Sequence, residues 1–201
     1  MLRVGLTGGI SCGKSLVAEM FRDRGVPVVD DDVAARDAVA PGSEGLAAVV
    51  AEFGQGVLRP DGSLDRPALG RTVFADDGLR RRLMEITHPR IGALIAQRLG
   101  AAEASGAALV VYESALLVEN GAADAWRPLV VVRADRELQI ARMARRNGLS
   151  REEAEARIRA QTSVEEEAAL ADFVIDNSGS RRQAAARFER VYEALCARIA
   201  G

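Results

Sequence analysis

Near its start the sequence carries Gly8-Gly9-Ile10-Ser11-Cys12-Gly13-Lys14-Ser15. This stretch matches the pattern G-x-x-x-x-G-K-S/T at every fixed position. The apolar residues 2–7 before it predict a short β-strand, and residues 14–24 predict an α-helix. A strand, a glycine-rich loop and a helix in this order form the frame of a phosphate-binding loop. The alternative is a chance glycine-rich turn, which would not need that frame.

The residue types of this loop fit the binding of a nucleoside triphosphate. Glycines let the backbone approach phosphate oxygens closely, and the following helix adds the positive end of its dipole. We expect Lys14 to reach the β- and γ-phosphates and the Ser15 hydroxyl to bind Mg²⁺. Lys14 is the only lysine in the chain, and a compact ammonium fits between phosphate oxygens better than a planar guanidinium. The predicted ATP-binding loop runs from Gly8 to Leu16.

Length and composition limit the classes of protein to which the chain can belong. Its 201 residues are 48% hydrophobic and 28% charged, as in a globular protein with one core or a core plus a small insertion. The formal net charge of -2 argues against a general nucleic-acid or membrane-surface binder. No apolar run is long enough to span a bilayer, and the first residues lack a signal-peptide layout. We therefore expect a cytoplasmic protein without an obligate protein partner.

The two cysteines, Cys12 and Cys196, are too few for a disulfide framework, and a Cys/His zinc site would need more than the single histidine. Cys12 lies near the start of a predicted helix, where a thiol can become acidic and reactive. The simpler interpretation, which we favour, is that a small residue fits this position of the loop.

Three carboxylates follow the second predicted strand, residues 26–29: Asp30, Asp31 and Asp32. Parallel sheets bind their ligands at the carboxyl ends of their strands. An aspartate there can accept the proton of an attacking hydroxyl or hold Mg²⁺ through water. At least one of the three is expected to cap the next helix instead, and we favour another as a catalytic group.

Several helices are predicted between this acidic turn and the next clear strand, whereas a βαβ crossover needs only one. Two of them cover residues 77–87 and a segment that starts at Pro89. The excess predicts a helical insertion over residues 61–105 that covers a substrate. His88 and Arg90 are candidates to bind an anionic acceptor there. A structural role for His88 and a solvated position for Arg90 are the alternatives.

Three further strands are predicted at residues 109–112, 129–132 and 173–175. Glu113 directly follows the first of them and resembles the second acidic element that assists Mg²⁺ beside a phosphate-binding loop. Leu116 and Glu119 lie in the loop beyond it, at the same end of the predicted sheet. The loop after the last strand contains Asn177 and could hold a nucleotide base.

Arginines cluster on two predicted helices that are separated by a glycine. Arg142, Arg145 and Arg146 share one helix face, and residues 150–153 form a capping box at the start of the next helix. This layout predicts a mobile lid over residues 142–162, in which Arg142 and Arg146 neutralise a moving phosphoryl group. Salt bridges to nearby glutamates are the alternative, and most of these arginines are expected to make only those.

A series of motifs runs through the chain from one end to the other. They are Gly5-Leu6-Thr7-Gly8-Gly9-Ile10 leading into Gly13-Lys14-Ser15, Val29-Asp30-Asp31-Asp32 with Ala35-Arg36, residues 60–66, His88-Pro89, Leu116-Leu117 with Glu119, Gly148-Leu149-Ser150 with Arg157 and Gln161, and Ile175-Asp176-Asn177-Ser178-Gly179. Together they resemble the dephospho-CoA kinase family of P-loop kinases. The phosphate-binding loop alone is common to many NTPases, whereas the whole series is specific.

The resemblance implies ATP-dependent phosphorylation of the ribose 3′-hydroxyl of dephospho-CoA, the last step of coenzyme A biosynthesis. It implies an α/β fold of three layers with a five-stranded parallel sheet, a helical acceptor-binding insertion and a helical lid. The implied catalytic residues are Asp32 as general base, Lys14 and Arg142. Mg²⁺ is then held by Ser15, with Asp32 or Glu113 acting through water. ATP would be bound by residues 8–16, Arg142 and Asn177, and the acceptor by Thr7, Asp30, Asp32, His88, Arg90, Leu116 and Glu119.

Some positions depart from the family pattern without removing a proposed catalytic group. The largest departure is Glu113-Ser114-Ala115, where Asp-x-Pro is usual. From the residues alone, two other functions stay open: a kinase for another hydroxyl acceptor, such as a nucleoside or a sugar acid, and a nucleotide-dependent switch. The acidic strand end and the arginine-bearing helices favour a transferase over a switch.

Overall fold

The computed structural model describes residues 1–74 and 76–200. The chain divides into two units, the first comprising Met1–Val29 with Ala102–Gly201 and the second Asp30–Ala101. Among the described residues, no helix combines the length and the apolar composition that crossing a bilayer requires.

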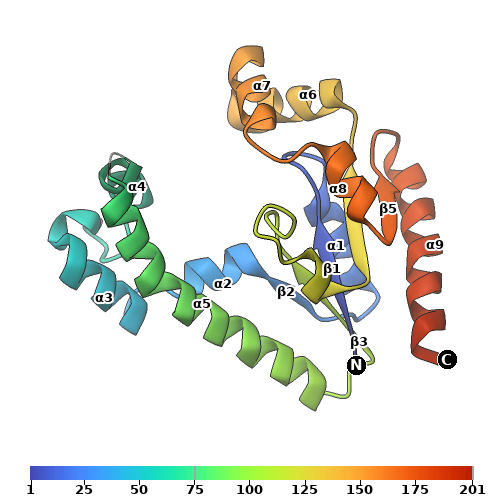
Figure 1. Cartoon of the computed structure of the whole chain (residues 1–201), viewed down its shortest axis with the longest axis horizontal. Helices are drawn as coiled ribbons and strands as arrows, with labels where there is room; N and C mark the ends of the chain where they lie inside the picture. The colour runs from blue at the N-terminus through green and yellow to red at the C-terminus, as the bar shows by residue number, and fades with distance from the viewer. Residues whose placement is uncertain (75, 201) are drawn as a thin grey trace. The chain divides into compact units, whose positions relative to one another are not determined.

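A five-stranded sheet with the order β2-β3-β1-β4-β5 organises the first unit (Figure 1). The strands are β1 (Leu2–Thr7), β2 (Val28–Asp30), β3 (Leu109–Glu113), β4 (Leu129–Arg133) and β5 (Phe173–Asp176). Strand β1 pairs in parallel with β3 and β4, and β4 pairs in parallel with β5. The predicted α/β class with five strands is confirmed. Strand β2 begins at Val28 and not at Val26, and it ends at Asp30.

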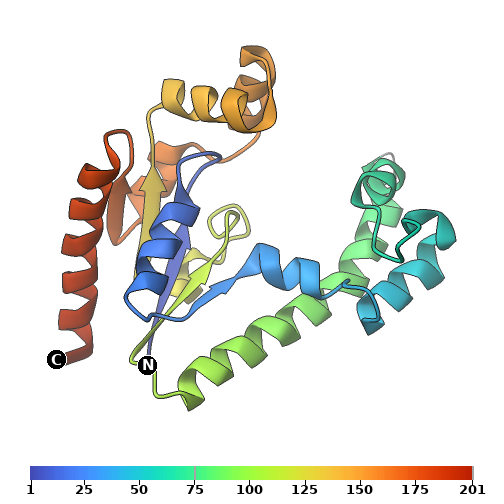
Figure 2. The same ribbon diagram turned by 180° about the vertical axis from the view of Figure 1, so that it is seen from behind.

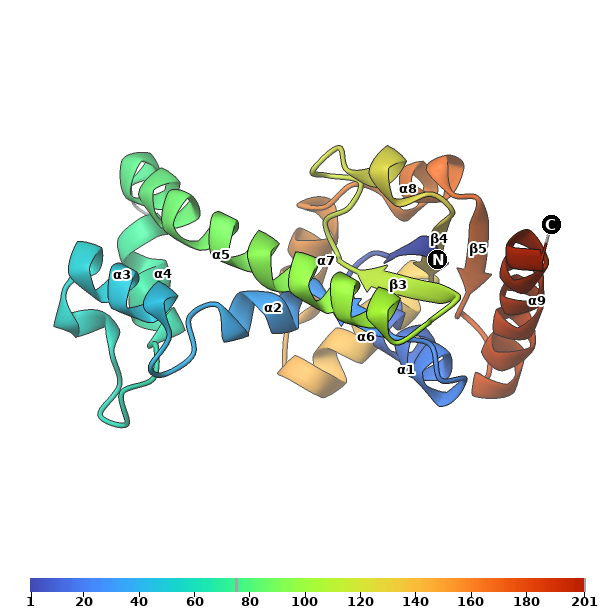
Figure 3. The same cartoon turned by 90° about the horizontal axis from the view of Figure 1, so that it is seen from below.

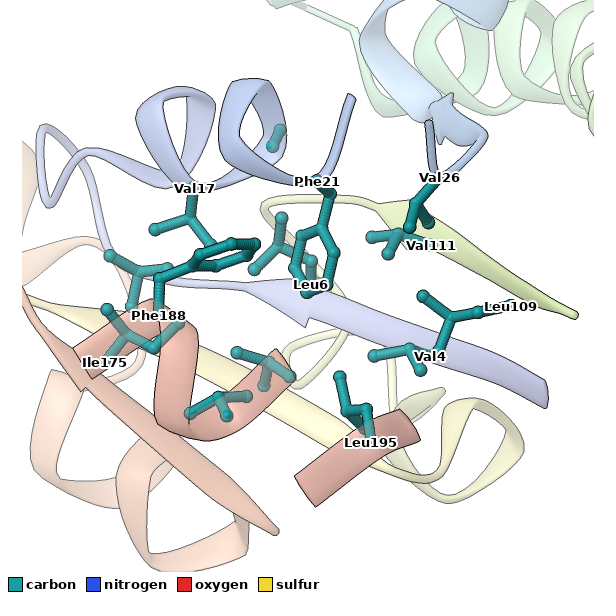
Figure 4. Close-up of a cluster of buried hydrophobic side chains, with 14 of the residues drawn as sticks. Val4, Leu6, Val17, Phe21, Val26, Leu109, Val111, Ile175, Phe188 and Leu195 are labelled. Carbon is teal, nitrogen blue, oxygen red and sulfur yellow. The ribbon is translucent and has the colours of Figure 1, made fainter. Parts of the chain in front are cut away.

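The main core lies between the sheet and helices α1 (Lys14–Asp23) and α9 (Arg181–Ala200). Figure 4 shows side chains of β1 facing those of both helices. Phe21 of α1 meets Phe188 of α9 edge to face, with ring centroids 4.8 Å apart, a favoured aromatic geometry. Helix α9 also runs beside β5 (Figure 3). This packing fixes the start of α1, where the glycine-rich loop ends.

The remaining elements of the first unit are η2 (Ala123–Trp126), α6 (Arg136–Asn147), α7 (Arg151–Arg159) and α8 (Val164–Leu170). Gly148 adopts φ 66° directly after α6 and ends that helix. Helices α6 and α7 share a small core of Ile140, Met143 and Ala154. They lie beyond the carboxyl end of β4 (Figure 2), where parallel sheets place their ligands.

The second unit contains α2 (Asp31–Asp37), α3 (Glu44–Phe53), η1 (Gln55–Val57), α4 (Arg66–Phe74) and most of α5 (Asp77–Ala104). Its core joins Leu46 and Val49 of α3 to Val57, Leu64 and Leu69. Because residues before position 61 contribute to this core, the unit begins at residue 30, earlier than the predicted insertion at 61–105.

The prediction of two helices around Pro89 is wrong, because α5 continues through it from Asp77 to Ala104. A proline removes one backbone donor and usually kinks or ends a helix. Pro89 has no N–H to donate to the carbonyl oxygen of Glu85, one turn earlier, and the helix nevertheless continues on both sides of it. The preference for a helix boundary before proline is only a preference.

Candidate active site

The glycine-rich loop connects β1 to α1, and two of its glycines are required by close contacts. A Cβ atom on Gly13 would lie 2.1 Å from Nδ2 of Asn177, and Gly13 has φ +95°. A Cβ atom on Gly8 would lie 2.3 Å from the carbonyl oxygen of Val132. Ser11 is the non-glycine residue of the loop in the left-handed region, with φ 57°. Such strained conformations cluster at functional sites.

The N-terminus of α1 is open to an anion. Its N-cap residue is Gly13, and no side chain caps the helix. The first N–H groups of a helix lack intrahelical acceptors, and they sit at the positive end of the helix dipole. The loop and the first turn of α1 therefore form a backbone site for phosphate oxygens.

Lys14 makes a buried ion pair with the residue that ends β3. Its Nζ lies 2.9 Å from Oε1 of Glu113, and Glu113 is 3% exposed. Arg22 Nη2 lies 3.4 Å from Oε2 of the same carboxylate. Glu113 is thus paired with two cations, Lys14 and Arg22. Sequence reasoning found Lys14 and Glu113, but it missed Arg22.

Arg142 braces the loop from α6. Its guanidinium donates to the carbonyl oxygens of Ser11 at 3.0 Å, Cys12 at 3.1 Å and Asn177 at 3.0 Å. Asn177, which is 3% exposed, donates from Nδ2 to Cys12 O at 2.8 Å. A cavity of about 190 Å³ beside this brace is lined by Ser11, Gly13, Ser15, Arg142, Arg145 and Arg146. The structure thus brings the predicted loop, Asn177 and the predicted arginines together.

The Cys12 thiol is fully buried, and Gln139 Nε2 lies 3.2 Å from its Sγ. Burial raises the pKa of Cys12 to about 11. A thiol must ionise to act as a nucleophile. The interpretation of Cys12 as a small, unreactive residue that fits the loop is therefore the one that the structure supports.

Glu167 of α8 is an unpredicted carboxyl group beneath the loop. It is fully buried, and neither carboxyl oxygen has a hydrogen-bond partner among the described residues. Burial, followed by the charge of Glu119, raises the pKa of Glu167 to about 7. The backbone amide of Gly9 is close enough to lower this pKa in part. The carboxyl group therefore titrates near neutral pH.

The predicted acceptor-binding residues occupy both units. In the first unit Thr7 is fully buried, whereas Leu116 and Glu119 are exposed. In the second unit His88 is exposed, and Arg90 bonds its own helix. Asp30 caps α2 by accepting the Val33 N–H at 3.0 Å, as expected of one of the three aspartates, and Asp32 is exposed in the first turn of α2.

Two glutamines, Gln139 and Gln161, bond the backbone of Ile10. The role of Gln139 was not predicted, although it precedes Arg142 by one helical turn and so shares its face. Gln161 appeared among the family motifs without a role. For Glu167 the sequence carries no signal, because it stands in a run of glutamates that normally face solvent.

The sheet order, the loop and the arginines around its cavity define the protein as a P-loop kinase, an enzyme of the α/β class. The family model for dephospho-CoA kinase, CoaE, matches residues 2–183. The chain belongs to the dephospho-CoA kinase family. Its reaction is the ATP-dependent phosphorylation of dephospho-CoA, the last step of coenzyme A biosynthesis.

Individual relatives agree with this assignment. A dephospho-CoA kinase of Geobacter sulfurreducens is 47% identical, over 94% of this chain and 96% of the relative. Among solved structures, TT1252 from Thermus thermophilus is similar with a TM-score of 0.83 and 36% identity, covering 100% of this chain and 98% of that one. A dephospho-CoA kinase from Campylobacter jejuni has a TM-score of 0.71 and 27% identity, with 96% of each chain covered.

Proposed function

We propose that the enzyme transfers the γ-phosphoryl group of ATP directly to the ribose 3′-hydroxyl of dephospho-CoA, with Asp32 accepting the proton of that hydroxyl. The family supplies the overall reaction. The observation that carries the assignment of the phosphate site is the open N-terminus of α1 beside Lys14 and the arginine-lined cavity.

In this proposal the backbone N–H groups at the start of α1 and Lys14 hold the phosphates of ATP. Lys14 leaves Glu113 for the phosphates, and Arg22 keeps the Glu113 carboxylate paired. Arg145 and Arg146 line the cavity beside the loop, and they would stabilise the charge of the moving phosphoryl group. Arg142 contributes chiefly by fixing the loop, since its guanidinium already bonds three carbonyl oxygens.

Asp32 is preferred to Asp30 as the base because the two carboxylates have different surroundings. Asp30 uses one carboxylate oxygen as the N-cap of α2. Asp32 is exposed, and no hydrogen bond or ion pair is formed by its side chain within residues 1–74 and 76–200. A general base must be able to reach the substrate hydroxyl, so the accessible carboxylate is the better candidate.

The residues near the loop also fit a Mg²⁺ ion. The exposed Ser15 hydroxyl and the carboxylate of Glu113 are oxygen donors, and no cluster of three or more His, Cys, Asp or Glu residues is found in the described part of the chain. Mg²⁺ is commonly held by one or two protein oxygens together with waters and substrate phosphates. When bound, Mg²⁺ would offset the negative charge of the β- and γ-phosphates.

The acceptor is assigned to Thr7, Asp30, His88, Arg90, Leu116 and Glu119 as a prediction that follows from the family resemblance. We also propose, from the residue patterns described above, a lid over residues 142–162, an acceptor-binding role for residues 61–105 and a cytoplasmic location.

The test is ADP release with Mg-ATP and a panel of acceptors: dephospho-CoA, adenosine, AMP, gluconate and none. We expect release only with dephospho-CoA, together with formation of CoA by mass spectrometry. Lys14→Ala should lose nucleotide binding and turnover together. Release with another acceptor would discard the acceptor assignment, and equal slow release in every well would favour a nucleotide-dependent switch.

A further inference from the structure

One residue of the phosphate-binding loop, Ile10, is held by three separate attachments. Its N–H donates to Oε1 of Gln161 at 2.8 Å, and its carbonyl oxygen accepts from Nε2 of Gln139 at 2.7 Å. Its side chain packs against the small core that α6 and α7 share. Gln139 belongs to α6, and Gln161 follows the end of α7 at Arg159. We name Ile10, Gln139 and Gln161 the Ile10 clamp.

The clamp restricts the backbone of the loop directly before Ser11. With its N–H bonded to Gln161, Ile10 does not offer that group to a phosphate. The next residue, Ser11, has φ 57°, a conformation that costs of order 1 kcal/mol and persists only when neighbouring contacts impose it. The clamp fixes the peptide groups of Ile10 before Ser11, and Arg142 fixes the carbonyl group after it.

The clamp also lies at a wall of a cavity that borders the loop. This cavity has a volume of about 560 Å³, and Gly9, Ile10, Gln139 and Gln161 are among its lining residues. On this side the backbone of the loop is therefore held by the polar bonds of Gln139 and Gln161. Loss of one of these bonds should change the conformation of the loop.

We propose that Gln139 and Gln161 are positioning residues of the kinase. They hold the phosphate-binding loop in the form that presents its backbone N–H groups to ATP, and they couple that form to the α6–α7 pair. The inference rests on the proposed phosphate site, but it concerns ATP alone. It predicts that losing either amide weakens the use of ATP and leaves the use of dephospho-CoA unchanged.

The test compares Gln161→Met with Gln161→Glu in the full chain. Methionine keeps the length of the side chain but removes the acceptor, and we expect the KM for ATP to rise about 10-fold, the effect of leaving one partly buried N–H without a partner. Glutamate keeps an acceptor oxygen, and the KM for ATP should stay within about threefold of the wild type. The KM for dephospho-CoA should not change in either variant. Gln139→Met should behave as Gln161→Met does.

Gln183→Met is the matched control, because Oε1 of Gln183 accepts the Ser180 N–H at the same 2.8 Å, but outside the loop. It should leave the KM for ATP unchanged. An unchanged KM in Gln161→Met, an equal rise in the control, or no rescue by glutamate would each overturn the proposal. If Gln161→Met does not fold, hydrogen exchange of the wild type decides: slow exchange of the Ile10 amide supports the clamp, and fast exchange overturns it.

Discussion

The phosphate-binding loop and the acidic turn at residues 30–32 are built in opposite ways. Side chains from distant parts of the chain bond the loop backbone, among them Arg142, Gln161 and Asn177. In the turn, Asp30 caps its own helix and Asp32 is exposed. In the proposed function the loop recognises phosphates with backbone groups, which other residues must hold in place, whereas the proposed proton acceptor is a side chain that the substrate must reach. The loop therefore has a backbone held by other residues, and the turn has an accessible side chain.

The largest effect is expected in the acidic turn, at the exposed Asp32. Asp32→Asn should lower kcat about 100- to 10,000-fold, the usual contribution of a general base, and leave ATP binding unchanged. Because Asp32 is exposed, the melting temperature should hardly change. Asp31→Asn is the matched control, since it removes the same charge one residue earlier and should retain most of the turnover. Full turnover in Asp32→Asn would exclude this aspartate as the base.

Glu167→Gln tests whether the buried carboxyl group near the loop titrates between about pH 4.5 and about pH 7. The pKa of Glu167 is raised from 4.5 to about 7, so the folded chain binds this proton more firmly than the unfolded chain. The free energy of unfolding therefore falls as pH rises from about 4.5 to about 7, and the loss amounts to about 3 kcal/mol. Glutamine cannot ionise, so the variant should be more stable than the wild type at about pH 8 by up to that amount, and much less so at about pH 5.

Urea unfolding at both pH values measures this difference. Glu165→Gln is the control, because Glu165 is exposed on the same helix and should leave the pH dependence as it is. A wild type and a Glu167→Gln variant that lose stability in parallel as pH rises would show that Glu167 does not titrate in this range.

Arg142→Met distinguishes two roles of Arg142: fixing the loop backbone and acting on the phosphoryl group as part of a lid. Losing a charged donor to three carbonyl oxygens should raise the dissociation constant for ATP about 30-fold, or about 2 kcal/mol. Arg142→Lys should restore only part of the affinity, since an ammonium does not reproduce the planar guanidinium fork. Titration with a fluorescent ATP analogue, without acceptor, gives the value. An unchanged dissociation constant with a reduced kcat would instead assign Arg142 to the lid role predicted from the sequence.

The smallest effect is expected for Arg22→Leu. The Arg22 side chain is 43% exposed and lies 3.4 Å from Glu113, and such pairs contribute about 0.2–1 kcal/mol. The KM for ATP should change by a factor of about 5 or less. Arg24→Leu, which removes a similarly exposed arginine from its ion pair with the more exposed Glu189, is the control with no expected change. A loss as large as that of Arg142→Met would mean that Glu113 depends on Arg22 alone.

Local patterns predicted most of the fold. The apolar runs gave all five strands, and the capping box at Ser150 is present with both of its hydrogen bonds. The continuity of α5 through Pro89 was missed because a proline favours a helix boundary before it, and this is a preference that the flanking helical residues can override.

Lys14 was singled out by the loop motif and Glu113 by its position at the end of a strand, and the structure pairs these two side chains. The partners of the loop backbone were not predicted. Gln161 bonds a residue 151 positions away, and Gln139 one 129 positions away. Bonds between a side chain and a distant backbone group leave no periodic pattern in the sequence, because any residue can supply the backbone partner.

The ion pair of Lys14 with Glu113 has a practical consequence for chemical labelling. Since Lys14 is the only lysine, an amine-directed acylating reagent finds one side-chain amine in the sequence, and that amine lies at the proposed phosphate site. Mass spectrometry of the peptide that contains Lys14 then reports its acylation separately from that of the α-amino group. An acyl phosphate of a nucleotide would mark this enzyme at a single known atom, without any engineered tag.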